Sequence, residues 1–117
     1  VFTGDQLDRR PSDAALFSRG FRGLHAPLGV FGILGNHDHM VEPELAEGAL
    51  IDAGITPLVN EVAVLDRGGA RLALVGVDEI SADHPWGADF SLLGGFADAF
   101  RICLCHQPRG WHDALAA

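Results

Sequence analysis

The chain has 117 residues, of which 48% are hydrophobic, and it carries eight Arg, no Lys and 16 Asp or Glu residues, for a net charge of −8. This length and composition predict one globular domain with a modest core and exclude a disordered chain. The acidic balance argues against binding nucleic acid through a basic surface, and no apolar run approaches the roughly 18 to 20 residues of a membrane span.

Apolar runs bounded by glycine, proline or polar residues predict short strands separated by helices. The expected strands are residues 1–3, 30–34, 55–59 (a short strand or an extended link), 62–66, 71–77 and 101–105. The expected helices are residues 14 to about 24 after a Ser12-Asp13 cap, 44–53 between Pro43 and Gly54, a short one near 90–93, and one that starts at 110.

Two adjacent glycines, Gly68 and Gly69, predict a hairpin between the fourth and fifth expected strands. Cys103 and Cys105 lie two apart on the last strand and share one face, so a disulfide between them is not expected. They are interpreted as small buried hydrophobes, with metal ligation as the alternative. Alternating strands and helices with one hairpin predict an α/β fold with helices packed on the sheet.

Polar side chains follow three of the expected strands. Asp5 and Asp8 come after the first, the segment 36–39 after the second, and His106 after the last. Because ligands of such sheets bind at the carboxyl ends of strands, we expect these side chains to share one crevice. Asp, Asn and His donors from separate strands suit Mn, Fe, Zn or Co better than Ca.

Two such ions about 3.5 to 4 Å apart can clamp a phosphoryl group and activate water, with a carboxylate as the bridge between them. A further His that binds no metal can protonate the leaving oxygen, and a carboxylate behind it supports its charge. For each motif taken alone, ordinary turn chemistry after a strand is the alternative interpretation.

The order of these motifs resembles that of the calcineurin-like metallophosphoesterases. The signature of that family runs D-x-H, G-D-x-x-D, G-N-H-D or G-N-H-E, a single His after a strand, and G-H-x-H. Residues 4–8 (GDQLD), residues 35–38 (GNHD) and His106 after its strand match the three middle blocks in order and spacing. The resemblance implies a binuclear centre of two divalent metal ions, Mn, Fe, Zn or Co.

The resemblance also implies a role for each matching residue. Asp5 would bridge both metals, and Asn36 and His106 would ligate the second metal. His37 would face the phosphate as the general acid, and Asp8 would hydrogen-bond to it.

Three neighbours of these residues have weaker assignments. Arg9 is at the place where some branches of the family bind phosphate, although a surface Arg is the usual case. His39 is close enough to contact substrate, with an ordinary polar role as the alternative. Asp38 is expected to brace its loop and not to bind metal.

The chain departs from the family pattern at both ends. No D-x-H block precedes Val1, and no G-H-x-H block follows His106. Residues 1–117 therefore look like a single partial domain of the four-layer metallophosphoesterase fold, a mixed sheet with flanking helices. We expect this chain alone to bind metal poorly and to lack normal turnover.

Three functions follow from the resemblance. The first is metal-dependent hydrolysis of a phosphomonoester or phosphodiester. The second is a non-catalytic binding or scaffold role on the same fold. The third is a nuclease branch, which would need basic surface outside these residues, because the acidic charge makes nucleic acid an unexpected partner.

The substrate expectation rests on residues 74–78 (LVGVD), which resemble relatives that act on small phosphorylated or lipid-linked substrates. Such relatives are cytoplasmic or membrane-associated, and association with a membrane would use segments outside residues 1–117. The loop 78–95 is the expected specificity element, in which Trp86 and Phe90 either line a pocket or anchor the loop. His25, His84 and His112 are expected at the surface or in loops.

Overall fold

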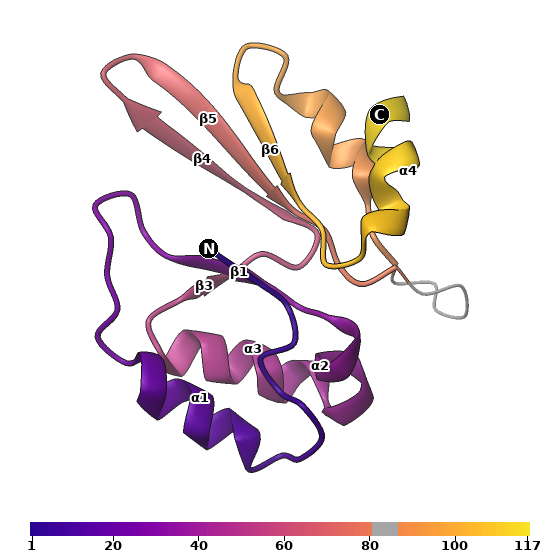
Figure 1. Cartoon of the computed structure of the whole chain (residues 1–117). Helices are drawn as coiled ribbons and strands as arrows, with labels where there is room; N and C mark the ends of the chain where they lie inside the picture. The colour runs from indigo at the N-terminus through magenta and orange to yellow at the C-terminus, as the bar shows by residue number, and fades with distance from the viewer. Residues whose placement is uncertain (81–86) are drawn as a thin grey trace.

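The computed structural model describes residues 1–80 and 87–117 (Figure 1). His84, expected at the surface or in a loop, and Trp86, expected to line a pocket or to anchor its loop, lie outside the described residues. The described strands are β1 (Phe2–Thr3), β2 (Phe31–Ile33), β3 (Thr56–Pro57), β4 (Glu61–Arg67), β5 (Ala70–Gly76) and β6 (Phe100–Leu104). The helices are α1 (Asp13–Phe21), α2 (Asn36–Val41), α3 (Pro43–Asp52) and α4 (Trp111–Ala116), with 3₁₀ turns η1 (Phe90–Gly95) and η2 (Pro108–Gly110).

The strands form two sheets. In the first, β1, β2 and β3 pair in parallel in that order. In the second, β5 is central, antiparallel to β4 and parallel to β6. The α/β class is confirmed, but the mixed pairing expected of the whole sheet belongs to the second sheet only.

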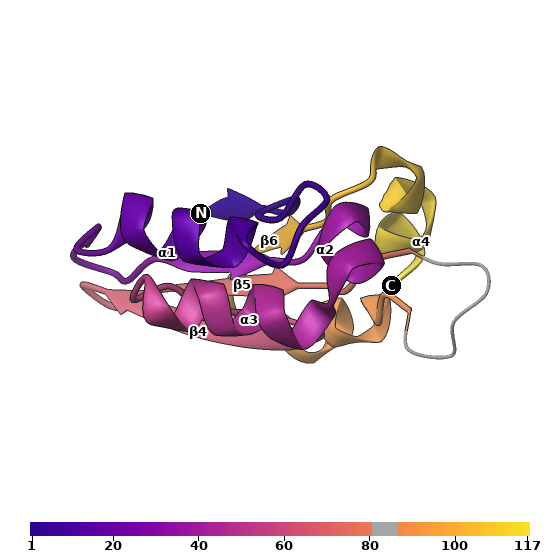
Figure 2. The same ribbon diagram turned by 90° about the horizontal axis from the view of Figure 1, so that it is seen from below.

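Three apolar clusters stack the elements into layers. One cluster joins α1 and α3 to the outer face of the first sheet, and Figures 1 and 2 show these two helices side by side. A second lies between the sheets, where Ile33 and Leu58 meet Leu74 and Leu104. The third packs Val75 and Val77 of the opposite face against Leu93 of η1 and Ala114 of α4. The order is therefore helix, sheet, sheet, helix, and each fully buried Leu or Ile contributes about 1.5 to 3 kcal/mol.

Glycine and proline set the boundaries that were predicted from the sequence. Gly68 and Gly69 have φ values of 62° and 83°, as a tight two-residue hairpin turn requires. Pro43 is in the first turn of α3, and Gly54, with φ of 82°, follows its end. Cys103 and Cys105 are free thiols packed in the third cluster, where burial raises the pKa of both.

Some local predictions were wrong. The helix expected to reach about Leu24 ends at Phe21, and Ser12 makes no side-chain capping bond. Instead, the Asp13 carboxylate accepts hydrogen bonds from the backbone N–H groups of residues 8, 9 and 10, which lower the pKa of its carboxyl. Helix α2 was not predicted. No helix within residues 1–80 or 87–117 has the length and apolar character needed to cross a membrane.

Candidate metal centre

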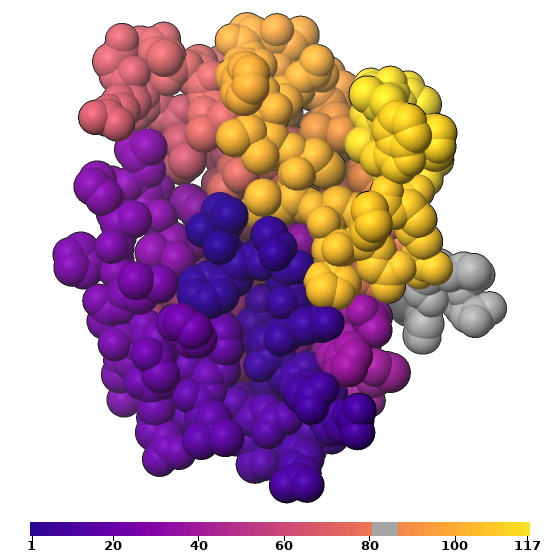
Figure 3. All heavy atoms as spheres, in the orientation of Figure 1, coloured from indigo at the N-terminus to yellow at the C-terminus, as the bar shows by residue number. Residues whose placement is uncertain are grey.

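The residues after β1, β2 and β6 meet at one edge of the two sheets. Figure 3 shows the segments from the two ends of the chain side by side on this face, the N-terminal one in indigo and the C-terminal one in orange and yellow. A hydrogen bond of 2.7 Å between His106 Nδ1 and the Thr3 carbonyl oxygen joins them across the two sheets. The segments that follow β1 and β6 are therefore in direct contact.

Two glycines allow this close approach. A Cβ atom on Gly4, whose φ is 102°, would overlap the His106 ring, and one on Gly35 would overlap the carboxylate and backbone of Asp5. Asp5 itself has φ of 57°, a left-handed conformation that Asp tolerates better than most residues. This backbone turns the Asp5 carboxylate toward the loop after β2, where Oδ1 accepts the His37 backbone N–H at 3.1 Å.

Three side chains, Asp5, Asn36 and His106, converge at the centre of this edge, and we call them the donor trio. His106 Nε2 lies 3.1 Å from Asn36 Oδ1 and 3.4 Å from Asp5 Oδ1. Because Nδ1 donates its proton to the Thr3 carbonyl, a neutral imidazole presents a lone pair at Nε2. Three electron-pair donors then face one another.

This arrangement fits a divalent cation. A backbone carbonyl that fixes the tautomer of a His is the usual support for a metal ligand, and the set of one carboxylate, one amide oxygen and one imidazole is a transition-metal set. Among the described residues, no group of three or more His, Cys, Asp or Glu side chains is placed to hold a metal ion. The donor trio contains only two residues of those types, so it would supply part of a coordination shell.

His37 lies beside the donor trio and has a separate partner. Its Nδ1 is 2.8 Å from the Asp8 carbonyl oxygen and 3.2 Å from Asp8 Oδ1. The Asp8 carbonyl has the largest effect and raises the pKa of His37 above the ordinary 6.5. Burial opposes this rise in pKa, and the charges of Asp5 and Asp8 add to it. The imidazole is 31% exposed, so its Nε2 edge is accessible to a ligand.

Asp38 is fully buried and braces the two loops. Its Oδ1 accepts the Leu7 backbone N–H at 2.8 Å, and its Oδ2 accepts the Gly35 N–H at 2.9 Å. The second bond reaches back to the residue that precedes α2, as in a capping box. Asp38 therefore has the bracing position expected from the sequence, with both oxygens engaged.

Arg9 has little to hold it. Its side chain is 82% exposed and approaches only the Asp8 carboxylate, at 3.8 Å. No contact among the described residues orients the Arg9 side chain toward the donor trio. A role for Arg9 in binding phosphate stays a prediction.

His39 has a partner that the sequence did not reveal. Its Nε2 lies 2.7 Å from Oδ1 of Asp78, a carboxylate only 8% exposed, and this bond raises the pKa of His39. Asn60, in a left-handed conformation with φ of 53°, accepts the N–H groups of Asp78 and Asp89 and donates to the Gly87 carbonyl. The bonds of Asn60 therefore hold the two ends of the loop after β5, at Asp78 and at residues 87–89, to the start of β4. The bond to His39 joins the Asp78 end to α2.

The residues that sequence reasoning missed, Asn60 and Asp78, gave only faint signals. Asn60 is a polar residue directly after an apolar run, and Asp78 ends another such run. A substrate role for His39 stays a prediction, and only its Nδ1 edge is free of the Asp78 bond.

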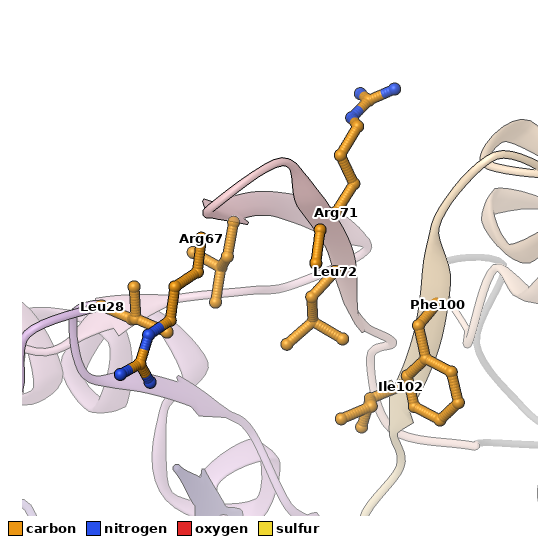
Figure 4. Close-up of a pocket in the computed structure, with 8 residues that line it drawn as sticks. Leu28, Arg67, Arg71, Leu72, Phe100 and Ile102 are labelled. Carbon is orange, nitrogen blue, oxygen red and sulfur yellow. The ribbon is translucent and has the colours of Figure 1, made fainter.

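An apolar cavity of about 330 Å³ lies away from these residues, at the hairpin end of the second sheet (Figure 4). Its lining consists of Leu28, Leu65, Arg67, Ala70, Arg71, Leu72, Phe100 and Ile102. None of these residues belongs to the donor trio or its neighbours. The polar centre and the apolar cavity are therefore separate features.

Known proteins give no independent assignment for these features. Comparison with models of known families, with curated proteins and with solved structures finds no match to this chain.

Proposed function

We propose that the chain forms the central part of a metal-dependent phosphoesterase centre of the calcineurin-like type, which hydrolyses a phosphomonoester or phosphodiester. The observation that carries the proposal is the convergence of the donor trio from the ends of β1, β2 and β6, with His106 Nε2 facing two oxygen acceptors. When the imidazole is neutral and its proton is on Nδ1, these three atoms face one another with no proton between them, which costs free energy. A bound divalent ion removes that cost.

Two divalent ions at this edge would polarise the phosphoryl oxygens and activate a water molecule. The chain's own part is to hold these ions and to supply a proton. Asp5 would be the bridging carboxylate, and the contacts of its Oδ1 with His106 and with the His37 N–H support this assignment. Asn36 and His106 would hold one side of the pair.

His37 is the proposed proton donor. Its raised pKa favours the protonated imidazole, and the Asp8 carbonyl fixes Nδ1 so that Nε2 carries the mobile proton. An acid of this kind contributes about 100-fold or more to the rate of a reaction in which an oxygen leaves. The substrate class follows from the chemistry of this acid and the metal pair together.

The test uses the natural full-length protein with Mn²⁺ and two chromogenic substrates, p-nitrophenyl phosphate and bis(p-nitrophenyl) phosphate. His37→Ala should lower kcat by roughly 100-fold, which corresponds to about 2.7 kcal/mol, while the exposed His25→Ala should leave it unchanged. Turnover should also fall as pH rises through the His37 pKa, which lies above 6.5, because the acid loses its proton.

Each result has one meaning. Equal rates for His37→Ala and wild type would remove His37 as the acid. Binding of Mn²⁺ without hydrolysis of either substrate would favour the non-catalytic scaffold role instead. Hydrolysis that is confined to DNA or RNA would favour the nuclease branch.

A further inference from the structure

The Glu79 carboxylate is the most unusual buried group in the described part of the chain. The residue is 7% exposed, and neither side-chain oxygen has a hydrogen-bond partner among residues 1–80 and 87–117. Within the same residues, its one ion-pair neighbour is Arg109, whose Nη2 is 3.7 Å from Oε1 and donates its hydrogen bond to the Ile80 carbonyl instead. A buried carboxylate is normally surrounded by donors, so Glu79 lacks the partners that its position requires.

The position of Glu79 connects it to the donor trio. Strands β5 and β6 are parallel neighbours, with Gly76 opposite Leu104, and the Val77 N–H donates to the Leu104 carbonyl at 3.1 Å. Glu79 and His106 therefore follow adjacent strand ends. Burial raises the pKa of the Glu79 carboxyl.

The charges nearby select the kind of group that Glu79 would accept. The Glu79 backbone N–H donates to Asp78 Oδ1 at 2.7 Å, so the preceding residue already uses its carboxylate on the backbone, and the charge of Asp5 also acts on the Glu79 carboxyl. The unpartnered oxygens of the Glu79 carboxylate would repel an anion. A cation, or a donor polarised by a cation, would satisfy the unpartnered oxygens.

Glu79 does not form a direct ligand group with Asp5 and His106. No three His, Cys, Asp or Glu side chains of the described residues are close enough together to bind one metal ion, so Glu79 does not join Asp5 and His106 in a single inner shell. A water molecule could connect the Glu79 carboxylate to the cation, because outer-shell carboxylates of metal centres accept hydrogen bonds from metal-bound water.

We propose that Glu79 is an outer-shell carboxylate of the candidate metal centre, where it accepts a hydrogen bond from the hydration shell of a divalent cation at the donor trio. The inference rests on the proposed function. It implies that the Glu79 carboxylate lowers the stability of the metal-free protein and strengthens binding of the metal ion. A purely structural ion pair with Arg109 would have the opposite effect on the metal-free protein.

The experiment measures two quantities on the natural full-length protein: the affinity for Mn²⁺, by electron paramagnetic resonance of the free ion, and the Tm without metal. Glu79→Gln should weaken Mn²⁺ binding by about 10-fold or more and should leave the metal-free Tm equal or higher. Glu44→Gln, an identical change on the exposed side of α3, should alter neither quantity. Glu79→Asp, which keeps the charge, should give an intermediate loss of affinity and serves if the Gln variant does not fold.

Three outcomes overturn the inference in distinguishable ways. If Asn36→Ala abolishes Mn²⁺ binding while Glu79→Gln does not weaken it, the centre stands and Glu79 has no part in it. If Glu79→Gln lowers the metal-free Tm and keeps the affinity, Glu79 is a structural partner of Arg109. If the wild-type protein takes up no Mn²⁺, the proposed function fails together with this inference.

Discussion

Asp38→Asn tests how the two loops of the centre are held together. In the wild type, the two Asp38 oxygens accept the Leu7 and Gly35 backbone N–H groups at 2.8 and 2.9 Å, in a fully buried position. An amide offers one oxygen, so one of the two N–H groups would face an NH₂ donor. That backbone N–H group and the NH₂ group of the new amide would both be buried without a hydrogen-bond acceptor.

The expected loss follows from these two bonds. A hydrogen bond to a charged group contributes about 1.5 to 3 kcal/mol, and an unsatisfied buried donor costs about 1 to 3 kcal/mol. Because one bond survives in weaker form, we expect a destabilisation of about 2 to 4 kcal/mol. For a chain of this size, that corresponds to a fall in Tm of roughly 6 to 20 °C.

Urea unfolding, followed by circular dichroism, measures this loss directly, and hydrogen exchange of the Leu7 and Gly35 amides locates it. Asp52→Asn, at the exposed end of α3, is the matched control and should change the free energy of unfolding by less than 0.5 kcal/mol. A loss for Asp38→Asn as small as that of the control would refute the bracing role. So would unchanged protection of both amides.

Three further predictions concern the residues around the donor trio. Gly35→Ala should weaken Mn²⁺ binding, because the new Cβ would displace the Asp5 carboxylate; affinity equal to that of Gly48→Ala, which has open space, would contradict this. The pKa of the His39 imidazole, measured by NMR, should lie above 6.5 and should return toward 6.5 in Asp78→Asn. The bond between His39 and Asp78 should stabilise the fold fully below pH 6.5, and this contribution should be lost as the pH rises through the raised pKa. Asn60→Ala should speed proteolysis at the bases of the loop after β5, since it removes three hydrogen bonds, and an unchanged cleavage rate would count against that anchor.

The local elements could be predicted where a single residue type controls the backbone. The hairpin followed from Gly68 and Gly69, and the bounds of α3 followed from Pro43 and Gly54. Helix α2 could not be predicted in the same way, because its polar start is stabilised by Asp38 reaching back to Gly35 within a buried site. The division into two sheets depends on contacts between distant residues, and no local pattern encodes it.

In the candidate site too, features that local sequence encodes could be predicted, and features that depend on contacts between distant residues could not. Asp5, Asn36 and His106 were found because each is a polar residue that follows an apolar strand in the sequence. The parallel strands β1 and β2 bring Asp5 and Asn36 to one edge, and His106 reaches them from β6 of the second sheet. Asp78 and Glu79 also follow a strand, but their burial depends on how β5 packs beside β6. Sequence alone gives no measure of that burial.

The central claim is that His106 Nε2 is a cation ligand, and ¹⁵N NMR of the His106 imidazole during titration with Zn²⁺ tests it most directly. At pH 8, the metal-free protein should carry the proton on Nδ1, which donates to the Thr3 carbonyl, and leave Nε2 unprotonated. Addition of Zn²⁺ should then shift the Nε2 resonance while the Nδ1 proton remains. An imidazole with protons on both nitrogens, or an Nε2 resonance that Zn²⁺ does not move, would contradict the account.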